Sequence, residues 1–308
     1  MTGRGGTFEL VEHAGGEPGP TVTVIGGIHG DEDEGVLAVQ RLGLALQGRP
    51  LARGSVRAVP IAHPAAYDAD QRVSPLDRGN LARSFPGDAK GSATERIAHD
   101  LTERAIRGSD LLIDLHSAGR AYAMPTFAGY VENGDDVSVR SRRAAVAFGA
   151  PLLWEHSGPA PSGRTLSTAI ELGIPCIYVE GSGGGSVERD ELDVYVGGVL
   201  RVLADLEMLS WEPPIGPGLR RVVRGEGGNL DAGITTPTSG RFVSASAPGD
   251  VLAAGDHIGE VVDALGRTAA EISAPADCTV MFLRRTARIE AGEVLCAVGP
   301  PAVAWSAA

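Results

Sequence analysis

The sequence is poor in cysteine. Its three cysteines, Cys176, Cys278 and Cys296, are scattered over 308 residues, and no two of them form a C-x-x-C pair. An odd, scattered set excludes a disulfide framework and a thiolate zinc site, and it favours a reducing compartment.

A surplus of basic charge and a long hydrophobic run are also absent. The chain has 27 Lys and Arg against 39 Asp and Glu, a formal net charge of −12. Nucleic acids and anionic membranes bind to basic surfaces, so we expect neither as a partner. No apolar run approaches the ~18 residues of a transmembrane helix, and the first residues carry no apolar signal segment. We therefore expect a cytoplasmic protein.

Apolar runs alternate with amphipathic stretches over residues 1–212. The pattern predicts strands at 21–25, 54–61, 110–115 and 175–179, and helices at 36–46, 138–148, 165–172 and 192–206. The sequence Ser92-x-x-Glu95 is a capping box that predicts the start of a further helix. This alternation indicates an α/β fold with a mostly parallel or mixed sheet and helices on both faces.

The composition changes at the Pro- and Gly-rich segment 213–218, which we interpret as a linker. Short β-like runs follow at 236–245, 258–262, 279–283 and 294–298, separated by Gly- and Asp-rich turns. They predict a small all-β barrel or sandwich over residues 213–308, with a turn rhythm like that of the biotinyl/lipoyl hammerhead. A carrier domain of that kind needs an acceptor lysine, and the only lysine is Lys90. A carrier function is therefore excluded.

Polar side chains follow three of the predicted strands. His29 and Glu32 come after residues 21–25, His116 directly after 110–115, and Glu180 directly after 175–179. In open parallel sheets, ligands bind beyond the carboxyl ends of the strands. Two histidines and a glutamate are a common ligand set of catalytic zinc. Glu180 is then placed to take a proton from the zinc-bound water and to pass it to a leaving nitrogen.

Each of these signals has a structural alternative. A single histidine at a strand end is usually a loop residue, and H-x-x-E occurs by chance in many chains. The acidic run 31–34 also suits a solvated helix N-terminus. Phosphate binding is disfavoured because no G-x-x-x-x-G-K-[ST] motif is present and the loops are acidic. The joint placement of all four residues favours a metal site.

At these residues the chain resembles the succinylglutamate desuccinylase/aspartoacylase family, a branch of the zinc carboxypeptidase superfamily. Four segments carry the resemblance, in order along the chain: Gly27-Ile28-His29-Gly30-Asp31-Glu32, Asn80-Leu81-Ala82-Arg83-Ser84-Phe85-Pro86-Gly87, Asp114-Leu115-His116 and Val179-Glu180-Gly181. The Phe85-Pro86-Gly87 context and the length are most similar to the N-acetyl-diaminobutyrate deacetylase-like group.

The resemblance implies a role for each matching residue. One Zn²⁺ per chain is bound by His29, Glu32 and His116, and Glu180 acts as general base and acid. Arg72 polarises the scissile carbonyl, and Arg83 binds a substrate carboxylate. The resemblance also suggests a homodimer. Without it, a surface salt bridge would be the preferred interpretation of both arginines.

Two positions depart from the family pattern. Ala82 replaces the asparagine beside the family arginine, which removes half of the usual carboxylate clamp. Asn80 stands where the superfamily often has an aspartate that orients a zinc-bound histidine, and Asp114 is a candidate for that role toward His116. Asn80 is also a candidate substrate-binding residue, together with Arg83. Arg164, just before the predicted helix 165–172, is a further candidate for binding the acyl or amino-acid part of a substrate.

We therefore expect a zinc-dependent hydrolase that cleaves the amide bond of a small N-acyl amino acid or related N-acyl amine. Two alternatives stay open at this point. One is a metallocarboxypeptidase acting on short peptides. The other is a non-catalytic zinc- or ligand-binding homologue, which the presence of Glu180 disfavours.

Overall fold

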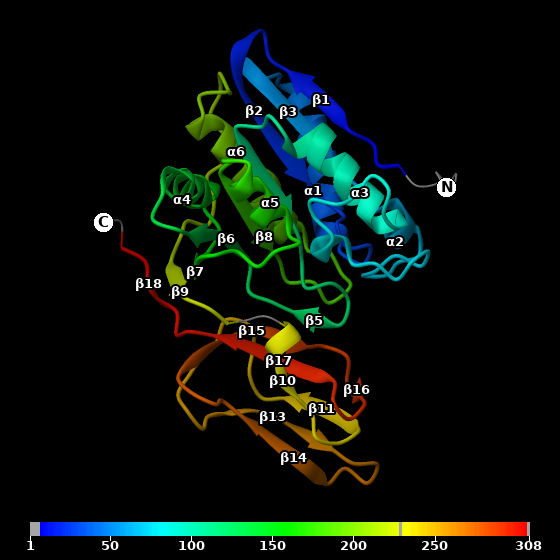
Figure 1. The fold of residues 1–308 in the computed structure, drawn as a ribbon. Coiled ribbons are helices and arrows are strands. Elements are labelled where there is room, and N and C mark those ends of the chain that lie inside the picture. The colour runs from blue at the N-terminus through cyan, green and yellow to red at the C-terminus, as the bar shows by residue number, and fades with distance from the viewer. Residues whose placement is uncertain (1–6, 228–229, 307–308) are drawn as a thin grey trace.

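A computed structural model describes residues 7–227 and 230–306 of the chain. A mixed sheet of nine strands forms the larger part of the molecule (Figure 1). Its strand order is β1 (Val11–Ala14), β3 (Arg53–Val59), β2 (Glu17–Ile25), β4 (Leu111–Leu115), β8 (Cys176–Glu180), β6 (Phe127–Glu132), β7 (Leu152–Ser157), β9 (Arg221–Arg224) and β18 (Val303–Ala304). β3, β2, β4 and β8 run parallel to one another, and β6 is antiparallel to β8.

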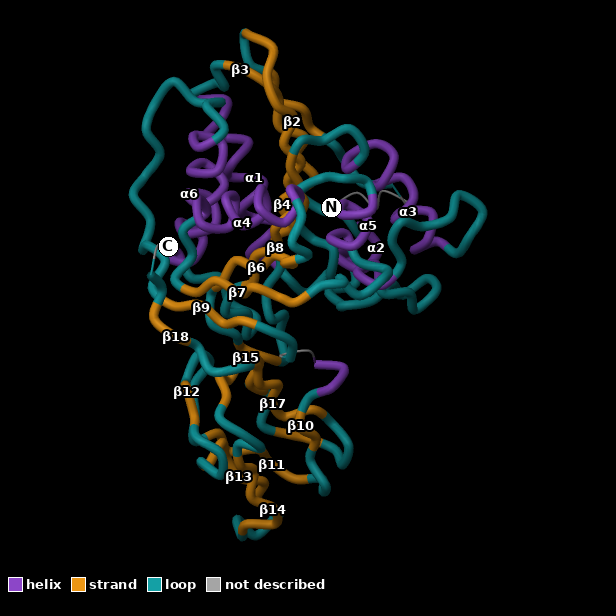
Figure 2. Tube along the Cα trace, turned by 60° about the vertical axis from the view of Figure 1, so that its left-hand side comes forward, coloured by secondary structure: helices purple, strands orange, loops and turns teal. Residues whose placement is uncertain are grey.

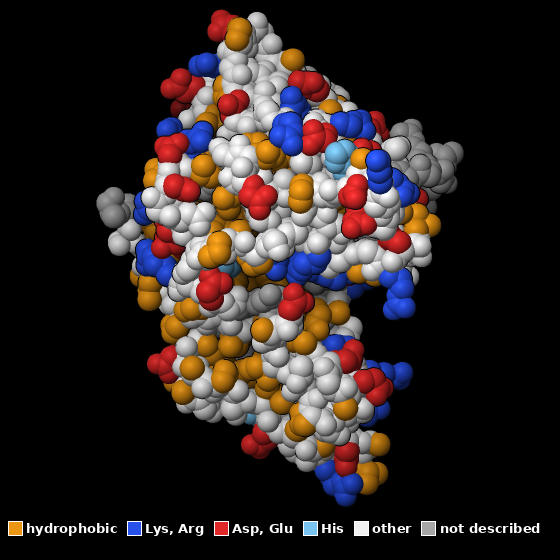
Figure 3. All heavy atoms as spheres, in the orientation of Figure 1, with side chains coloured by type: hydrophobic (Ala, Val, Ile, Leu, Met, Phe, Trp, Pro, Cys, Tyr) orange, Lys and Arg blue, Asp and Glu red, His pale blue; other side chains and the backbone are white. Residues whose placement is uncertain are grey.

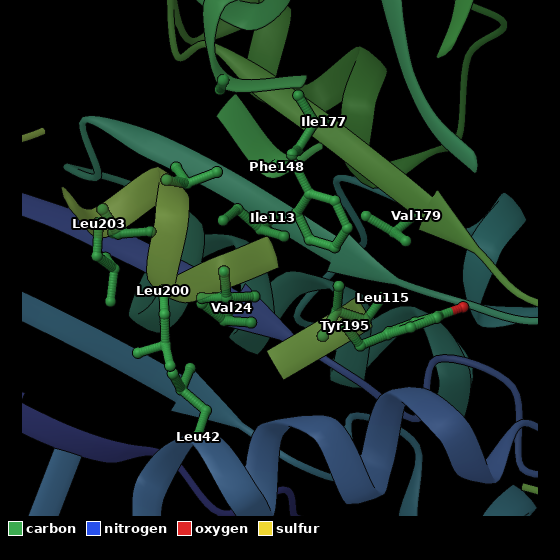
Figure 4. Close-up of a cluster of buried hydrophobic side chains, with 14 of the residues drawn as sticks. Val24, Leu42, Ile113, Leu115, Phe148, Ile177, Val179, Tyr195, Leu200 and Leu203 are labelled. Carbon is green, nitrogen blue, oxygen red and sulfur yellow. The ribbon is translucent and has the colours of Figure 1, made fainter. Parts of the chain in front are cut away.

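Helices cover both faces of this sheet, as Figure 2 shows. The helices are α1 (Asp33–Gly48), α2 (Pro64–Asp68), α3 (Ala93–Leu101), α4 (Asp136–Phe148), α5 (Thr165–Glu171) and α6 (Arg189–Asp205), with short turns η1 (Leu81–Arg83), η2 (Thr102–Ile106) and η3 (Leu230–Ala232). α1, α4 and α6 pack on one face, where Val24, Ile113 and Phe148 belong to the larger core cluster (Figure 4). α3 and α5 pack on the other face around a second buried cluster.

Two small antiparallel sheets form the C-terminal part. The first contains β10 (Ile234–Thr235), β17 (Val294–Gly299), β15 (Cys278–Arg284) and β12 (Val251–Leu252), and β5 (Tyr122–Ala123) pairs with β15. The second contains β14 (Thr268–Ser273), β13 (His257–Val262), β11 (Gly240–Ser244) and β16 (Arg288–Ile289). The sheets enclose their own apolar cluster, which includes Ile258, Val280 and Leu295. The predicted fold class, an α/β part followed by a small all-β part, is confirmed.

The predicted strands and helices are present, but the sheet is larger than the sequence indicated. β6 lies between the predicted strand 110–115 and the predicted helix 138–148, and β7 lies between the predicted helices 138–148 and 165–172; neither strand was predicted. β9 and β18 lie beyond residue 213 and still pair within the large sheet, so this sheet does not end at residue 212. The division of the chain at residue 213 stays a prediction.

Acidic and basic side chains are interspersed over the face in Figure 3. Among the described helices, none has the length and apolar character needed to cross a membrane. The expected cytoplasmic location and the homodimer stay predictions.

The contact between α4 and α6 supplies a test of the core. A Cβ added at Gly198 in α6 would overlap the ring of Phe148, which ends α4. We expect Gly198→Ala to lower the free energy of unfolding by about 1–3 kcal/mol, since an extra carbon in a packed core forces strain. Gly48→Ala, at the end of α1, is the matched control, because its Cβ would meet no described atom within 4 Å. Equal stabilities of the two variants in urea titrations would contradict this packing.

Candidate metal and substrate site

The candidate site lies where three adjacent parallel strands end. Ile25 of β2 pairs with Asp114 of β4, and Leu115 of β4 pairs with Val179 of β8. The loops that follow these strands therefore leave the sheet side by side. They carry His29 and Glu32 after β2, and His116 after β4, while Glu180 is the last residue of β8. The structure thus brings the four residues of the predicted constellation together.

The loop between β2 and α1 is compact because glycine stands where other residues would not fit. Gly27 has a positive φ of 63°, which side chains rarely allow. A Cβ at Gly30 would overlap the backbone of Ala66 in α2. The tight loop buries His29 and places Glu32 at the N-cap of α1.

His29, Glu32 and His116 form a buried cluster whose ligand atoms all lie within 4.8 Å of one another. Nδ1 of His29 is 2.6 Å from Oε1 of Glu32, and Nδ1 of His116 is 2.9 Å from Oε2 of the same carboxylate. Both imidazoles therefore present the same nitrogen to one carboxylate.

In each histidine, the partner of Nε2 determines whether Nδ1, the nitrogen that faces Glu32, carries a proton in the neutral ring. Asn80 Oδ1 accepts from the Ala82 amide and lies 3.3 Å from His29 Nε2, so that Nε2 is the donor. Asp114 Oδ2 lies 3.0 Å from His116 Nε2, which must also donate. In a neutral imidazole the other nitrogen, Nδ1, then carries a lone pair. Two lone pairs facing a carboxylate at these distances need a cation between them, either a proton or a metal ion.

Titration of the cluster agrees with this requirement. Burial, opposed by Glu32, lowers the pKa of His29 to about 4, which keeps this imidazole neutral near pH 7. Burial acts to raise the pKa of Glu32, but His29 and His116 outweigh it and hold the pKa well below its usual value. For His116, burial lowers the pKa, and Asp114 and Glu32 outweigh it and raise the pKa well above the ordinary value. The donor set and its outer hydrogen bonds fit a Zn²⁺ ion.

The groups around His116 are themselves held in place. Thr165, the first residue of α5, donates its hydroxyl to Asp114 Oδ2. The hydroxyl of Tyr195, in α6, donates to the backbone carbonyl of His116. Helices on opposite faces of the sheet thus fix the orientation of one ligand.

Glu180 lies beside the cluster with a largely buried carboxyl group. Its Oε2 atom is buried and has no hydrogen-bond partner among the described residues. Burial raises the pKa of Glu180 to about 8; the charge of His116 opposes this effect, and the negative charge of Glu32 adds to it. A carboxyl group with a pKa in this range can both release and accept a proton near neutral pH.

A cavity of about 250 Å³ opens beside this cluster and contains the candidate arginines. Arg72 donates from Nη1 to Glu32 Oε1 at 3.0 Å. Arg83 donates to Asp231 Oδ2 at 3.2 Å, and its other terminal nitrogen to the carbonyl of Ala82. The Nε atom of Arg164 is buried and has no partner among the described residues.

Several lining residues were not among the predicted site residues. Trp154, Tyr178 and His156 line the cavity from the sheet, and Glu226 and Asp231 from the segment after β9. The strand-end pattern contained no signal for them, because β7 and β9 were not predicted.

A family model for the succinylglutamate desuccinylase/aspartoacylase catalytic domain matches residues 18–206. This chain belongs to the succinylglutamate desuccinylase/aspartoacylase family. The match includes all four residues of the constellation and the segment of Asn80 and Arg83, so the resemblance seen in the sequence is confirmed.

Individual relatives of this family support the assignment. An N-alpha-acetyl-L-2,4-diaminobutyric acid deacetylase of Halomonas elongata is 37% identical over 199 residues, which are 63% of this chain and 57% of that protein. The match thus spans little more than half the length of this curated relative.

Solved structures of the family superpose over nearly the whole chain. A succinylglutamate desuccinylase/aspartoacylase of Rhodobacter sphaeroides is 26% identical with a TM-score of 0.82, covering 97% of this chain and 90% of that chain. The ectoine utilization protein EutE (DoeB) of Ruegeria pomeroyi, solved with product bound, is 27% identical with a TM-score of 0.85, covering 94% of this chain and 88% of that chain. The C-terminal sheets are therefore part of the architecture that these family members share.

The raised pKa of Glu180 predicts how stability changes with pH. Between the ordinary pKa of 4.5 and the folded pKa of about 8, the folded chain holds a proton that the unfolded chain has released. The contribution of Glu180 to stability is therefore complete below pH 4.5 and is lost as the pH rises through 8. In chelator-treated protein, we expect Glu180→Gln to gain stability relative to the parent across this window.

Urea titrations at pH 5, 7 and 9 measure this difference. Glu271→Gln is the matched control, because it also removes one carboxylate but lies exposed on the edge strand β14. Parallel stability curves for Glu180→Gln and the parent protein would contradict a raised pKa.

Proposed function

We propose that this chain is a zinc-dependent deacylase that hydrolyses the amide bond of a small N-acyl amino acid or related N-acyl amine. The single observation that carries the proposal is the approach of two imidazole Nδ1 atoms to one buried carboxylate, at 2.6 and 2.9 Å, with the unpaired carboxyl oxygen of Glu180 beside them. The curated deacetylase relative supports the reaction class.

His29, Glu32 and His116 would hold one Zn²⁺ through both Nδ1 atoms and the carboxylate. Bound there, the ion would polarise the amide carbonyl and make water acidic enough to attack it at neutral pH. Asn80 and Asp114 would keep the two imidazoles in the tautomer that binds a metal.

Glu180 moves the proton in this mechanism. Its ionised carboxylate takes a proton from the attacking water. The protonated carboxyl group then delivers that proton to the nitrogen of the leaving amine, and the C–N bond breaks. Arg72 donates hydrogen bonds to the oxygen on which negative charge develops, which stabilises the tetrahedral transition state. The products are a carboxylate and a free amine.

Arg164 and Arg83 would bind the carboxylate of the substrate. Arg164 is the better candidate, because its buried Nε has no partner, whereas Arg83 already contacts Asp231. Burial lowers the pKa of Arg164, and the positive charge of Arg83 adds to this effect. A bound anion would counter both the burial of the Arg164 guanidinium and its repulsion by Arg83. Ala82 offers no polar side chain beside Arg83, so the clamp depends on the two arginines.

The carboxypeptidase alternative is disfavoured by the walls of the cavity. Glu226, Leu230 and Asp231 line it from the segment after β9, and Phe282 lines it from β15. These residues limit the space that a peptide extending from the scissile bond would occupy. A small acyl amino acid fits the volume better.

Metal binding and catalysis can be tested separately. We expect the purified protein to bind one Zn²⁺ per chain and His116→Ala to lose it, measured by elemental analysis after dialysis. Glu180→Gln should keep the zinc but lower kcat by about 10²–10⁴-fold, the usual contribution of a general acid–base group. The assay screens acetyl-, formyl- and succinyl-amino acids, with dipeptides as the competing substrate class.

Two outcomes would reject the mechanism. Zinc bound by His116→Ala as tightly as by the parent protein would place the metal elsewhere. Full activity of zinc-loaded Glu180→Gln would remove Glu180 from the proton transfer.

Arg164→Gln tests the carboxylate site. Loss of a charged hydrogen bond of about 1.5–3 kcal/mol should raise KM by about 10–100-fold for acyl amino acids and leave zinc content unchanged. Acyl amines without a carboxylate are the control and should be hydrolysed equally by parent and variant. An equal loss on both substrates would point to a structural role instead.

A further inference from the structure

The first turn of α6 contains a buried carboxylate that the mechanism above does not use. Oε1 of Glu191 accepts from the hydroxyl of Thr126 at 2.6 Å and from the amide of Ser182 at 2.7 Å, and Oε2 accepts from the Ser182 hydroxyl at 2.5 Å. All three donors are uncharged. A buried carboxylate is costly unless its oxygens are hydrogen-bonded, and these three bonds offset that cost. We therefore asked what Glu191 holds in place.

The donors of Glu191 lie on both sides of Glu180. Ser182 follows Glu180 by two residues, and Thr126 directly precedes Phe127, which pairs with Glu180 across β6 and β8. This pair is the last of its ladder, because β8 ends at Glu180 and β6 begins at Phe127. The end of an element opens more easily than its middle. Glu191 joins the two segments just beyond that end and so keeps it closed.

α6 also lies directly against the backbone that follows Glu180. A Cβ at Gly181 would overlap the hydroxyl of Tyr195 and the carboxylate of Glu191. Tyr195 and Glu191 are four residues apart in α6 and share one face of the helix. The Tyr195 hydroxyl donates to the backbone carbonyl of His116. One face of α6 therefore contacts both the segment of Glu180 and the segment of a proposed metal ligand.

The carboxyl group of Glu180 has little of its own to orient it. Its Oε2 atom is buried without a hydrogen-bond partner among the described residues. The backbone that carries Glu180 must then set the direction of its side chain. A general base must lie within hydrogen-bond reach of the proton that it moves, and a displacement of about 1 Å can lower the rate by about 10²-fold.

We propose that Glu191 is a positioning residue for Glu180. Its hydrogen bonds hold the end of β8 and so keep the Glu180 carboxyl group in place beside the metal cluster. Glu191 is not among the described residues that line the cavity, so it acts through Glu180 and does not touch the substrate. This inference rests on the proposed deacylase function and adds to it a residue outside the cavity.

Substitutions at Glu191 test whether its hydrogen bonds position Glu180. With zinc-loaded protein and the N-acyl amino acid hydrolysed fastest in the screen above, we expect Glu191→Ala to lower kcat by about 10–100-fold. KM and zinc content should change little. Glu191→Gln should retain most of the parent's kcat, because its amide oxygen can accept from the same donors and its NH₂ group can donate to the Ser182 hydroxyl. A Glu191→Gln variant as slow as Glu191→Ala would overturn the proposal.

Two further variants separate positioning from loss of stability. Gly198→Ala lies in the same helix and is expected to strain the core against Phe148, so its kcat per bound zinc should equal that of the parent. A loss of kcat in Gly198→Ala as large as in Glu191→Ala would assign the effect to general destabilisation. Thr126→Val removes one donor and keeps the side-chain shape, and it should give a smaller loss of kcat. If Glu191→Ala does not fold, Thr126→Val decides the same question.

Hydrogen exchange of the amides at 181–184 separates this inference from the proposed function. These amides should exchange faster in Glu191→Ala than in the parent, and at the parent's rate in Glu191→Gln and Gly198→Ala. If the parent hydrolyses none of the screened substrates, the deacylase function fails, and faster exchange confined to this segment still supports the hold of Glu191 on Glu180. Unchanged exchange in Glu191→Ala, or an unchanged kcat in an active protein, would reject the positioning role.

Discussion

The structure of the site depends on the buried carboxylate of Glu32, which two imidazole nitrogens approach at once. Asn80 and Asp114 each pair with Nε2 of a histidine, and the two Nδ1 atoms therefore face one carboxylate. A buried carboxylate needs positive charge beside it, and here a proton on His116 or a metal ion between the ligands supplies that charge. The fold that holds them, with β2 and β4 side by side and α1 starting at Glu32, thereby creates a place for a cation.

The charge distribution around this place differs from that of the chain as a whole. The chain carries a formal net charge of −12, yet Arg72, Arg83 and Arg164 all line one cavity. Each is near the metal cluster or near another arginine, so their positive charges add in a confined space of low polarity. Their acidic neighbours, Glu226 and Asp231, come from the segment after β9. Acidic groups thus line the cavity from both parts of the chain, because Asp114 and Glu180 of the α/β part line it as well.

Much of the fold and the metal cluster could be predicted because their signals are local. The strand before His29 and the strand before His116 are short apolar runs, and parallel strands of this kind end at the same edge. β6 and β7 escaped prediction because their patterns are weak. β6 contains Gly129, and β7 contains Glu155 and His156, which are polar within a sheet. Their partners, such as the Tyr130 hydroxyl that donates to Glu155, come from the neighbouring strand.

The sequence by itself determined which chemical groups follow the strands, which chemistries lack their residues, and where helices begin. These properties depend on residues a few positions apart. Only the tertiary structure decided which imidazole nitrogen faces Glu32, and how the segments after β8 and before β6 meet at the carboxylate of Glu191. Each of these depends on the register between strands that are distant in the chain, and a shift of one residue would turn the side chain to the other face of the sheet.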